Sequence, residues 1–433
     1  MTDSRLPASP RARGRGRHLL FLANFTIAKA AAYVMPLLLA ALASAQLYGG
    51  IELALAIGLQ ACAVLLGAPL AGITQVYLIR GDRAVGDLLL LLTFASALAL
   101  SVLTGLLWLV RAEALVVLTV SVLCVTVIQN VASTWFRMRG ERNRTAWGDG
   151  ASLMIAGAVV SGVVLGTGAD ATGSATLVFA LFTAFVALVS GVALLRHRAP
   201  GLRARLTRAS RIGMPMMVAG IFAIWLGVGG RILIGAVSAD DLAAYSLAFR
   251  VSGLALGVHQ LATTAAFPTL YAARTRHADR LLAWFLAAVL AVSAALALAG
   301  PFVVDLLTFS ALREQDIRAF KDLVPLTSFQ TFYWIGYALL QYRINRYGAA
   351  RASIAPLLAV TAGGIGIIVL AAHFVSNDIR LIVALIALHS VAYFATAWLI
   401  LARRKLPHVR VGLTAIFGGL VLGAIALAGA LSA

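Results

Sequence analysis

LLAWFLAAVLAVSAALALAGPFVVDLLTF, residues 281–309, is an apolar stretch of a kind that recurs along the whole chain. Its one charged residue is Asp305, whereas the segment just before it carries Arg274, Arg276 and Arg280. About 20 mainly apolar residues are long enough to cross a bilayer as a helix. We therefore expect a membrane-spanning helix whose first end faces the side that retains basic residues.

Thirteen such stretches predict an all-α polytopic membrane protein. The composition agrees, with 61% hydrophobic residues, 12% charged residues and a mean hydropathy of +0.95. A soluble domain carries about 25% charged residues, so a soluble protein is excluded. The expected spans cover residues 18–43, 49–79, 85–110, 113–136, 150–168, 173–195, 212–237, 242–271, 281–309, 322–345, 352–375, 380–402 and 411–431.

The 35 basic residues indicate how the spans are oriented, because they gather in alternate connectors. The opposite connectors hold few of them, namely Arg111, Arg313, Arg318, Lys321 and Arg380. Cytoplasmic loops retain Lys and Arg, so the N-terminus is predicted to be cytoplasmic and, after thirteen spans, the C-terminus external.

The same pattern divides the chain into parts. We expect a basic cytoplasmic tail at 1–17, six helices in 18–195, an arginine-rich cytoplasmic loop at 196–211, six helices in 212–402 and an extra helix at 411–431. The tail and first span also have features of a signal peptide, but an apolar run of that length with polar residues inside favours an uncleaved first helix.

Several classes of function are disfavoured by the composition. The net charge of +19 is spread over short loops, which favours contact with membrane lipids over nucleic-acid binding. Cys62 and Cys124 lie in apolar segments and predict small buried side chains, with no disulfide and no metal site. No phosphate-binding GxxxxGK motif is present, and no cofactor is expected.

Several segments resemble the bacterial polysaccharide transporters, the oligosaccharide-lipid flippases of the multidrug/oligosaccharidyl-lipid/polysaccharide exporter superfamily. The segments that carry the resemblance are Arg211-Ile212-Gly213-Met214-Pro215, Gly230-Arg231-Ile232-Leu233-Ile234-Gly235, Ala244-Tyr245-Ser246-Leu247-Ala248-Phe249-Arg250, Tyr48-Gly49 and Gly67-Ala68-Pro69-Leu70. One difference is Gly230, since family members often have an acidic residue before this arginine.

The resemblance implies a MATE-like core of twelve helices, arranged as two six-helix lobes. It also implies a flippase that moves undecaprenyl-diphosphate-linked oligosaccharide, a polysaccharide or O-antigen repeat unit, from the inner to the outer leaflet by alternating access. The expected location is the bacterial cytoplasmic membrane. The expected state is a monomer, and a polysaccharide polymerase is a candidate partner.

Three cations within the spans are the first candidate site: Lys29, Arg231 and Arg250. A charge near the bilayer centre costs about 2.5–3.5 kcal/mol or more, so each should face a cavity or a partner. All 16 acidic residues lie in loops or near helix ends, the nearest being Glu52 and Asp305. The three cations therefore predict an anionic guest such as a lipid diphosphate. The alternative is that the arginines reach outward or bond to backbone carbonyls.

A polar and aromatic row in the tenth span is the second candidate site. Its members recur at three- and four-residue spacing and share one helix face: Gln330, Tyr333, Trp334, Tyr337 and Gln341. Aromatic planes beside amide groups suit sugar rings, so this face is a candidate for substrate contact. The same pattern favours an ordinary packing seam between helices at least as strongly.

Other functions remain as alternatives. A lipid II flippase would carry a related lipid diphosphate, although such proteins usually have fourteen helices. A drug/cation antiporter of the same superfamily would need carboxylates deep inside a lobe. A membrane enzyme acting on lipid-linked sugars would need a large external loop, which the spacing of the spans excludes. We expect a transporter and not an enzyme.

Overall fold

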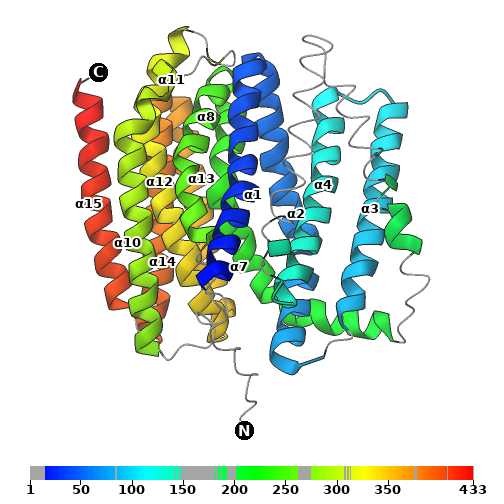
Figure 1. Ribbon diagram of the computed structural model, residues 1–433. Coiled ribbons are helices and arrows are strands. Elements are labelled where there is room, and N and C mark those ends of the chain that lie inside the picture. The colour runs from blue at the N-terminus through cyan, green and yellow to red at the C-terminus, as the bar shows by residue number, and fades with distance from the viewer. Residues whose placement is uncertain are drawn as a thin grey trace.

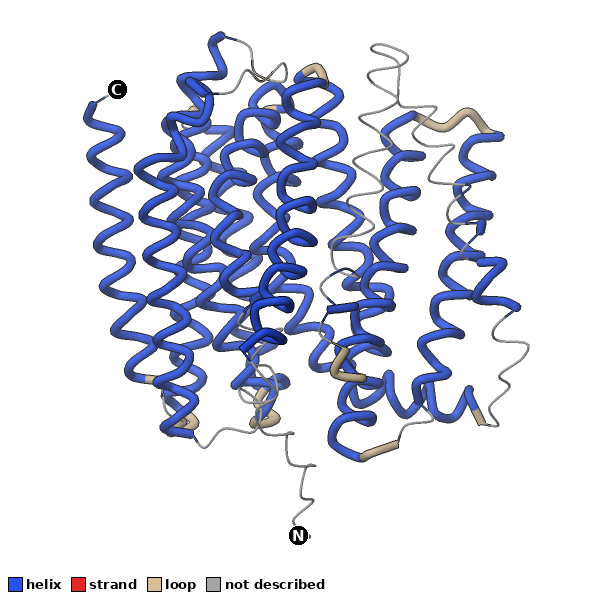
Figure 2. Tube along the Cα trace, viewed as in Figure 1, coloured by secondary structure: helices blue, strands red, loops and turns tan. Residues whose placement is uncertain are grey.

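The computed structural model describes residues 15–147, 181–192, 201–261 and 275–432, except for short gaps at 83–84, 142, 146, 182–183, 186, 307–308, 310–311, 313, 375–377 and 407. Within these ranges all regular elements are helices, and Figure 2 draws no strand. The all-α prediction is thus confirmed. The expected span at 150–168, most of that at 173–195, residues 262–271 and most of the tail at 1–17 lie outside the described residues.

In the first half, the helices match the expected spans closely. They are α1 (Arg15–Leu42), α2 (Ala45–Arg80), α3 (Gly86–Leu109) and α4 (Ala114–Met138). Capping explains the ends of α2: the Ser44 side chain accepts a hydrogen bond from the Leu47 amide at 3.3 Å, and Gly81 follows in the left-handed conformation at φ 69°.

In the second half, long helices alternate with short 3₁₀ turns. The elements are α7 (Leu202–Val237), η2 (Ala239–Asp241), α8 (Leu242–Ser252), η3 (Gly253–Ala255), α10 (Thr275–Ala299), η4 (Gly300–Phe302), α11 (Val303–Leu306), α12 (Glu314–Arg346), α13 (Ala350–Phe374), α14 (Ile379–Arg403) and α15 (Val409–Ser432).

The long helices run side by side along one direction (Figure 1). α2, α3 and α4 form one group, and α7, α8, α10 and α12 to α15 form another, with α1 in front where the groups meet. α1 begins at the lower end of the molecule and α15 ends at the upper end. This placement agrees with the predicted odd number of spans.

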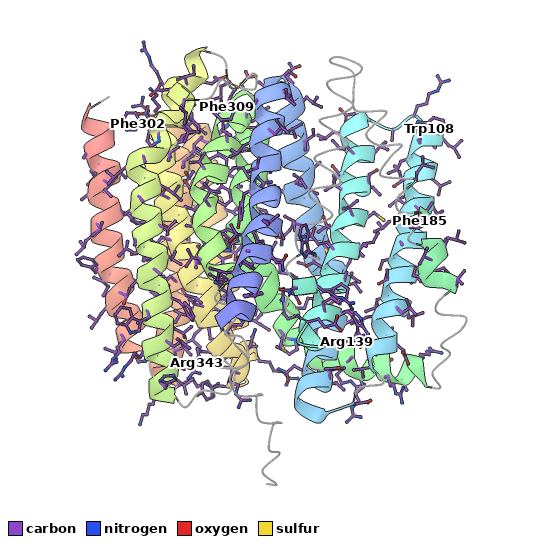
Figure 3. All side chains as sticks on the ribbon, in the orientation of Figure 1. Trp108, Arg139, Phe185, Phe302, Phe309 and Arg343 are labelled. Carbon is purple, nitrogen blue, oxygen red and sulfur yellow. The ribbon has the colours of Figure 1, made fainter. Side chains whose placement is uncertain are left out.

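The perimeter has the character of a lipid-facing surface. Nine helices among the described residues are long and apolar enough to cross a membrane. Large apolar side chains face outward, for example Trp108, Phe185 and Phe302, which are 72%, 62% and 63% exposed (Figure 3). Arg139 and Arg343 lie toward the lower end of the same view. The chain is a multi-pass membrane protein.

One expected boundary was wrong. Residues 202–211 were expected in a loop, but they form the first turns of α7, which lie across the bottom of Figure 1 before the helix turns upward. The arginines of this segment end the apolar pattern but do not end the helix. Pro215 lies inside α7, and a proline in a helix interior causes a kink. The expected span 281–309 corresponds to one candidate membrane span, His277–Leu306, in which the 3₁₀ turn η4 follows α10 directly.

α2 and α7 pack at very short range, in what we call the α2–α7 crossing. A Cβ atom added at Gly72 would lie 1.8 Å from the carbonyl oxygen of Ala209. One added at Gly213 would lie 1.8 Å from the carbonyl oxygen of Ala68. Glycine is required at both positions because the two backbones touch. This crossing joins the two groups of helices near the lower end.

Candidate functional site

Two of the three predicted interior cations meet at a single carboxylate, which we call the Arg–Glu–Arg cluster (Glu52, Arg231 and Arg250). Arg231 Nη1 lies 2.6 Å from Glu52 Oε2. Arg250 donates from Nε to Oε1 at 2.9 Å and from Nη2 to Oε2 at 3.0 Å. The Glu52 side chain is 1% exposed, so these are charge-assisted hydrogen bonds formed away from water.

The cluster joins elements that are far apart in the sequence. Glu52 belongs to α2, whereas Arg231 belongs to α7 and Arg250 to α8. The bonds therefore connect the two groups of helices toward their upper end. Two guanidinium groups and one carboxylate leave one net positive charge inside the protein.

Aromatic rings and a backbone carbonyl complete the surroundings of Arg231. Its Nη2 donates to the carbonyl oxygen of Gly227 at 3.1 Å. Its guanidinium carbon lies 5.2 Å from the ring centroid of Phe249, within the range of a cation–π contact. Phe249 in turn stacks on Trp334 of α12, with centroids 6.0 Å apart. The cation is thus fixed from several sides.

The expectation that every acidic residue lies in a loop or near a helix end was wrong for Glu52, which had been named as one of the two nearest acidic residues. Glu52 was assigned to a helix end, but by helical rise it lies about 10 Å inside α2, while Arg231 lies about 9 Å from the end of α7. Arg250 lies about 12 Å inside α8. All three residues therefore reach the same level.

The surroundings of Gly230 leave no room for a side chain at the position before Arg231. A Cβ atom at Gly230 would lie 2.0 Å from the hydroxyl oxygen of Tyr245. Tyr245 is buried and donates its hydroxyl hydrogen to Gln330 Oε1 at 3.1 Å. The tyrosine occupies the space that an acidic side chain would need, and Glu52 from α2 supplies the carboxylate instead.

The third cation, Lys29, is buried on α1. The residue is 5% exposed, and its Nζ lies 6.0 Å from the ring centroid of Phe25. By helical rise it is about 20 Å below the upper end of α1, about 10 Å deeper than the cluster. The structure therefore groups Arg231 and Arg250 and places Lys29 on another helix at a lower level.

The predicted polar and aromatic row is on α12, and much of it packs against α7. Gln330 Nε2 donates to the carbonyl oxygen of Leu226 at 3.3 Å, and Trp334 Nε1 to that of Ala223 at 2.8 Å. The Tyr337 hydroxyl is 3.5 Å from the carbonyl oxygen of Ala219. These acceptors follow one another along one side of α7, so the row joins the two helices.

The remaining members of the row face other neighbours. The Tyr333 hydroxyl donates to the carbonyl oxygen of Ala415 on α15 at 3.0 Å. Gln341 Nε2 donates to Asn345 Oδ1 at 3.0 Å. Apart from Trp334, which is half-buried, the row is buried. In this conformation the row is a packing seam, and its contact with sugar stays a prediction.

Comparisons with known proteins identify the fold. No protein-family model matches the sequence, and none of the curated proteins matches it. Among solved structures, the chain is similar to the inward-facing conformation of a multidrug-resistance transporter of the MATE family, in the MOP superfamily. The TM-score is 0.50 at 16% identity, over 94% of this chain and 98% of that one.

A second solved structure with the same overall similarity is the lipid II flippase MurJ in its inward closed conformation. The TM-score is 0.50 at 13% identity, over 95% of this chain and 93% of that one. At these identities the likeness establishes the fold. The predicted MATE-like architecture is therefore correct, and the chain has the fold shared by MATE transporters and MurJ.

Proposed function

We propose that the protein translocates undecaprenyl-diphosphate-linked oligosaccharide from the cytoplasmic to the outer leaflet of a bacterial inner membrane by alternating access. The observation that carries the proposal is the net positive charge of the Arg–Glu–Arg cluster, in which two guanidinium groups share one carboxylate inside the helix bundle. Lys29 is a further buried cationic residue at a deeper level. Fixed interior cations favour an anionic guest, and a guanidinium binds phosphate through two parallel bonds.

The distribution of arginine supports placing the lower end in the cytoplasm. Three helices that end there, α4, α12 and α14, carry Arg137, Arg343 and Arg403 in their last turns. Positive residues accumulate in cytoplasmic connectors. With this orientation the Arg–Glu–Arg cluster lies in the outer half of the membrane and holds the lobes 18–195 and 212–402 together on that side.

The cluster offers a simple mechanism for coupling substrate to lobe movement. Arg250 is the more accessible of its two arginines, with a side chain 18% exposed against 5% for Arg231. A diphosphate that approaches through the interior competes with Glu52 for the Arg250 guanidinium. Once Arg250 binds phosphate, its two hydrogen bonds to Glu52 are weakened, and these bonds connect α8 to α2. Separation of the lobes on the outer side then costs less free energy.

Membrane potential would favour this direction of transport. With the cell interior negative, outward movement of one negative charge releases about 2.3 kcal/mol per 100 mV. A diphosphate with about two charges gains nearly twice that amount if its charge crosses uncompensated. Contact of the α12 row with sugar would require α12 and α7 to part, since the polar groups of Gln330 and Trp334 bond to α7 carbonyls in this conformation.

Two other functions of the same fold are distinguishable. A lipid II flippase would use the same phosphate chemistry, and the similarity to MurJ supports it as the second candidate. A cation antiporter needs a carboxylate that is open to a cationic substrate. The buried Glu52 is already bonded to two arginines, which disfavours this alternative.

The test is flipping of fluorescent undecaprenyl-diphosphate-oligosaccharide in proteoliposomes, with and without an imposed potential, in parallel with fluorescent lipid II. Hydrogen bonds to charged groups contribute about 1.5–3 kcal/mol each. Lys29→Ala and Arg250→Ala should therefore each reduce flipping about ten- to a hundredfold.

The matched control is Arg318→Ala, which removes an exposed positive charge near the outer end of α12. It should leave the rate unchanged. Unchanged flipping in both Lys29→Ala and Arg250→Ala would show that the interior cations are structural. Efflux of organic cations without flipping of any lipid-linked sugar would replace the flippase by an antiporter.

A further inference from the structure

A second basic cavity lies at the lower end of the molecule, well away from the Arg–Glu–Arg cluster. It has a volume of about 430 Å³ and lies between α2, α7, the end of α12 and the start of α13. Its polar side chains are Gln75, Arg211, Asn345, Arg346 and Arg351. Along α7, Arg211 is about 30 Å of helical rise from Arg231, so the two basic sites are separate.

The cavity has the charge of an anion-binding site. Three of its lining side chains are arginines, and no carboxylate is among the described residues that line it. A neighbouring cavity of about 770 Å³ shares Arg211 and Ile212 and adds Arg203 and Arg208. A continuous basic surface therefore extends from the cavity along the first turns of α7.

The backbone adds to this positive potential. The first residues of α13, Ala350 and Arg351, line the cavity, and α13 is 25 residues long. The N-terminus of such a helix carries a partial positive charge. The opposing end of α12 has its carbonyl groups engaged, with Gly348 N bonding to Asn345 O at 3.2 Å and Ala349 N to Ile344 O at 2.9 Å. The turn depends on Gly348, whose φ is 67°.

Apolar surface beside the cavity indicates that the anion belongs to a lipid. On α13, Arg351 is followed at i+7 by Leu358, which is 56% exposed on the perimeter. On α7, Met214 lies between the lining residues Ile212 and Pro215 and is 50% exposed. An acyl chain can lie on this apolar surface while its headgroup reaches the arginines. Basic pockets between membrane helices on the cytoplasmic side suit phosphate headgroups.

We propose that this cavity binds the phosphate of an anionic lipid headgroup through Arg211, Arg346 and Arg351. Each guanidinium can form two bonds to phosphate oxygens. Because the arginines come from α7, α12 and α13 and the cavity wall includes α2, a bound headgroup connects both groups of helices beside the α2–α7 crossing. The proposal does not depend on the identity of the transported substrate.

The test is native mass spectrometry of the full-length protein with cardiolipin, which carries two phosphates, and phosphatidylcholine as the zwitterionic comparison. We expect cardiolipin to bind more tightly than phosphatidylcholine. Arg346→Gln and Arg351→Gln should each weaken cardiolipin binding about tenfold or more, because each removes a charge-assisted contact. Both side chains are exposed, so melting temperatures without added lipid should stay close to that of the unmodified protein.

The matched control is Arg404→Gln, an exposed arginine at the lower end that lines neither cavity. Cardiolipin affinity should be unchanged in this variant. An equal loss in all three variants would reduce the effect to general surface charge and overturn the site. Unchanged affinity in Arg346→Gln and Arg351→Gln would also overturn it. Displacement of cardiolipin by inorganic pyrophosphate at equal concentration would support the phosphate site but refute a lipid as its ligand.

Discussion

Replacing Glu52 by Gln tests whether the Arg–Glu–Arg cluster keeps the two groups of helices together at their upper end. The change keeps the shape of the side chain and removes the negative charge. Three hydrogen bonds of 2.6–3.0 Å then lose their charged acceptor, and the buried Arg231 and the half-buried Arg250 both lose this carboxylate as counter-ion. Breaking a buried ion pair by removing one partner costs about 3–5 kcal/mol.

This cost applies to the conformation in which the cluster is formed. If the two groups of helices separate at their upper end in another conformation, the cost shifts the equilibrium toward that conformation by about a hundred- to a few thousandfold. The double variant Glu52→Gln with Arg250→Gln restores the net charge of the cluster to that of the original protein. We expect the double variant to recover a large part of the population in which the two groups of helices stay together. The reason is that the two residues interact directly, so the effects of their substitutions are not additive.

Pulsed electron paramagnetic resonance between spin labels at Arg111 and Ala239 measures the populations directly. Both residues are exposed, and they lie beyond the upper ends of α3 and α7, in the two groups of helices. Cys62 and Cys124 are buried, so labelling there should be low. We expect a longer distance component in Glu52→Gln.

The matched control for this experiment is Asp305→Asn. Asp305 pairs with Lys321 at 2.8 Å but is 52% exposed, and an exposed pair contributes at most about 1 kcal/mol. Its distance distribution should match that of the unmodified protein. A lower melting temperature in Glu52→Gln with an unchanged distance distribution would refute the reasoning, because it would show that the cluster stabilises both conformations equally.

Two further predictions concern stability, measured as melting temperature in detergent. Gly213→Ala should destabilise the protein by at least about 1–3 kcal/mol, because the added Cβ would collide with the Ala68 carbonyl oxygen. Gly220→Ala on the same helix places its Cβ in open space, so it should be neutral or stabilising by up to about 1 kcal/mol. Equal effects would contradict the α2–α7 crossing. Trp334→Phe removes the donor to Ala223 and should cost about 1 kcal/mol more than Trp284→Phe, whose ring is 70% exposed; an equal loss would show that the bond contributes nothing.

The helices were largely predictable because bilayer thickness fixes their length. The expected spans 380–402 and 411–431 differ from α14 and α15 by one or two residues at each end. The start of α7 was missed for a physical reason. A helix that continues into water loses its apolar pattern but keeps its backbone hydrogen bonds, so hydropathy locates the membrane boundary and not the helix end.

The candidate site was partly predictable. A charge within an apolar span is conspicuous, and this pattern singled out Arg231 and Arg250. Their pairing with Glu52 was not evident, because the bonds join residues separated by 179 and 198 positions and hydropathy contains no information on which helices touch. A packing seam was one of the two interpretations of the α12 row, but the sequence did not show that α7 is the neighbour, since the side chains suit either sugar or backbone carbonyls.

The α2–α7 crossing has a mechanical consequence. From Gly213 to Arg231 the rise along α7 is about 27 Å, so a tilt of α7 about the crossing would produce a large displacement at the level of Arg231. A tilt of about 10° between the two helices would move their outer ends apart by about 5 Å, which exceeds the range of every hydrogen bond that Glu52 makes. Because Gly72 and Gly213 lie at this lower crossing, a small tilt there is enough to break the ion pairs near the upper ends of the same two helices.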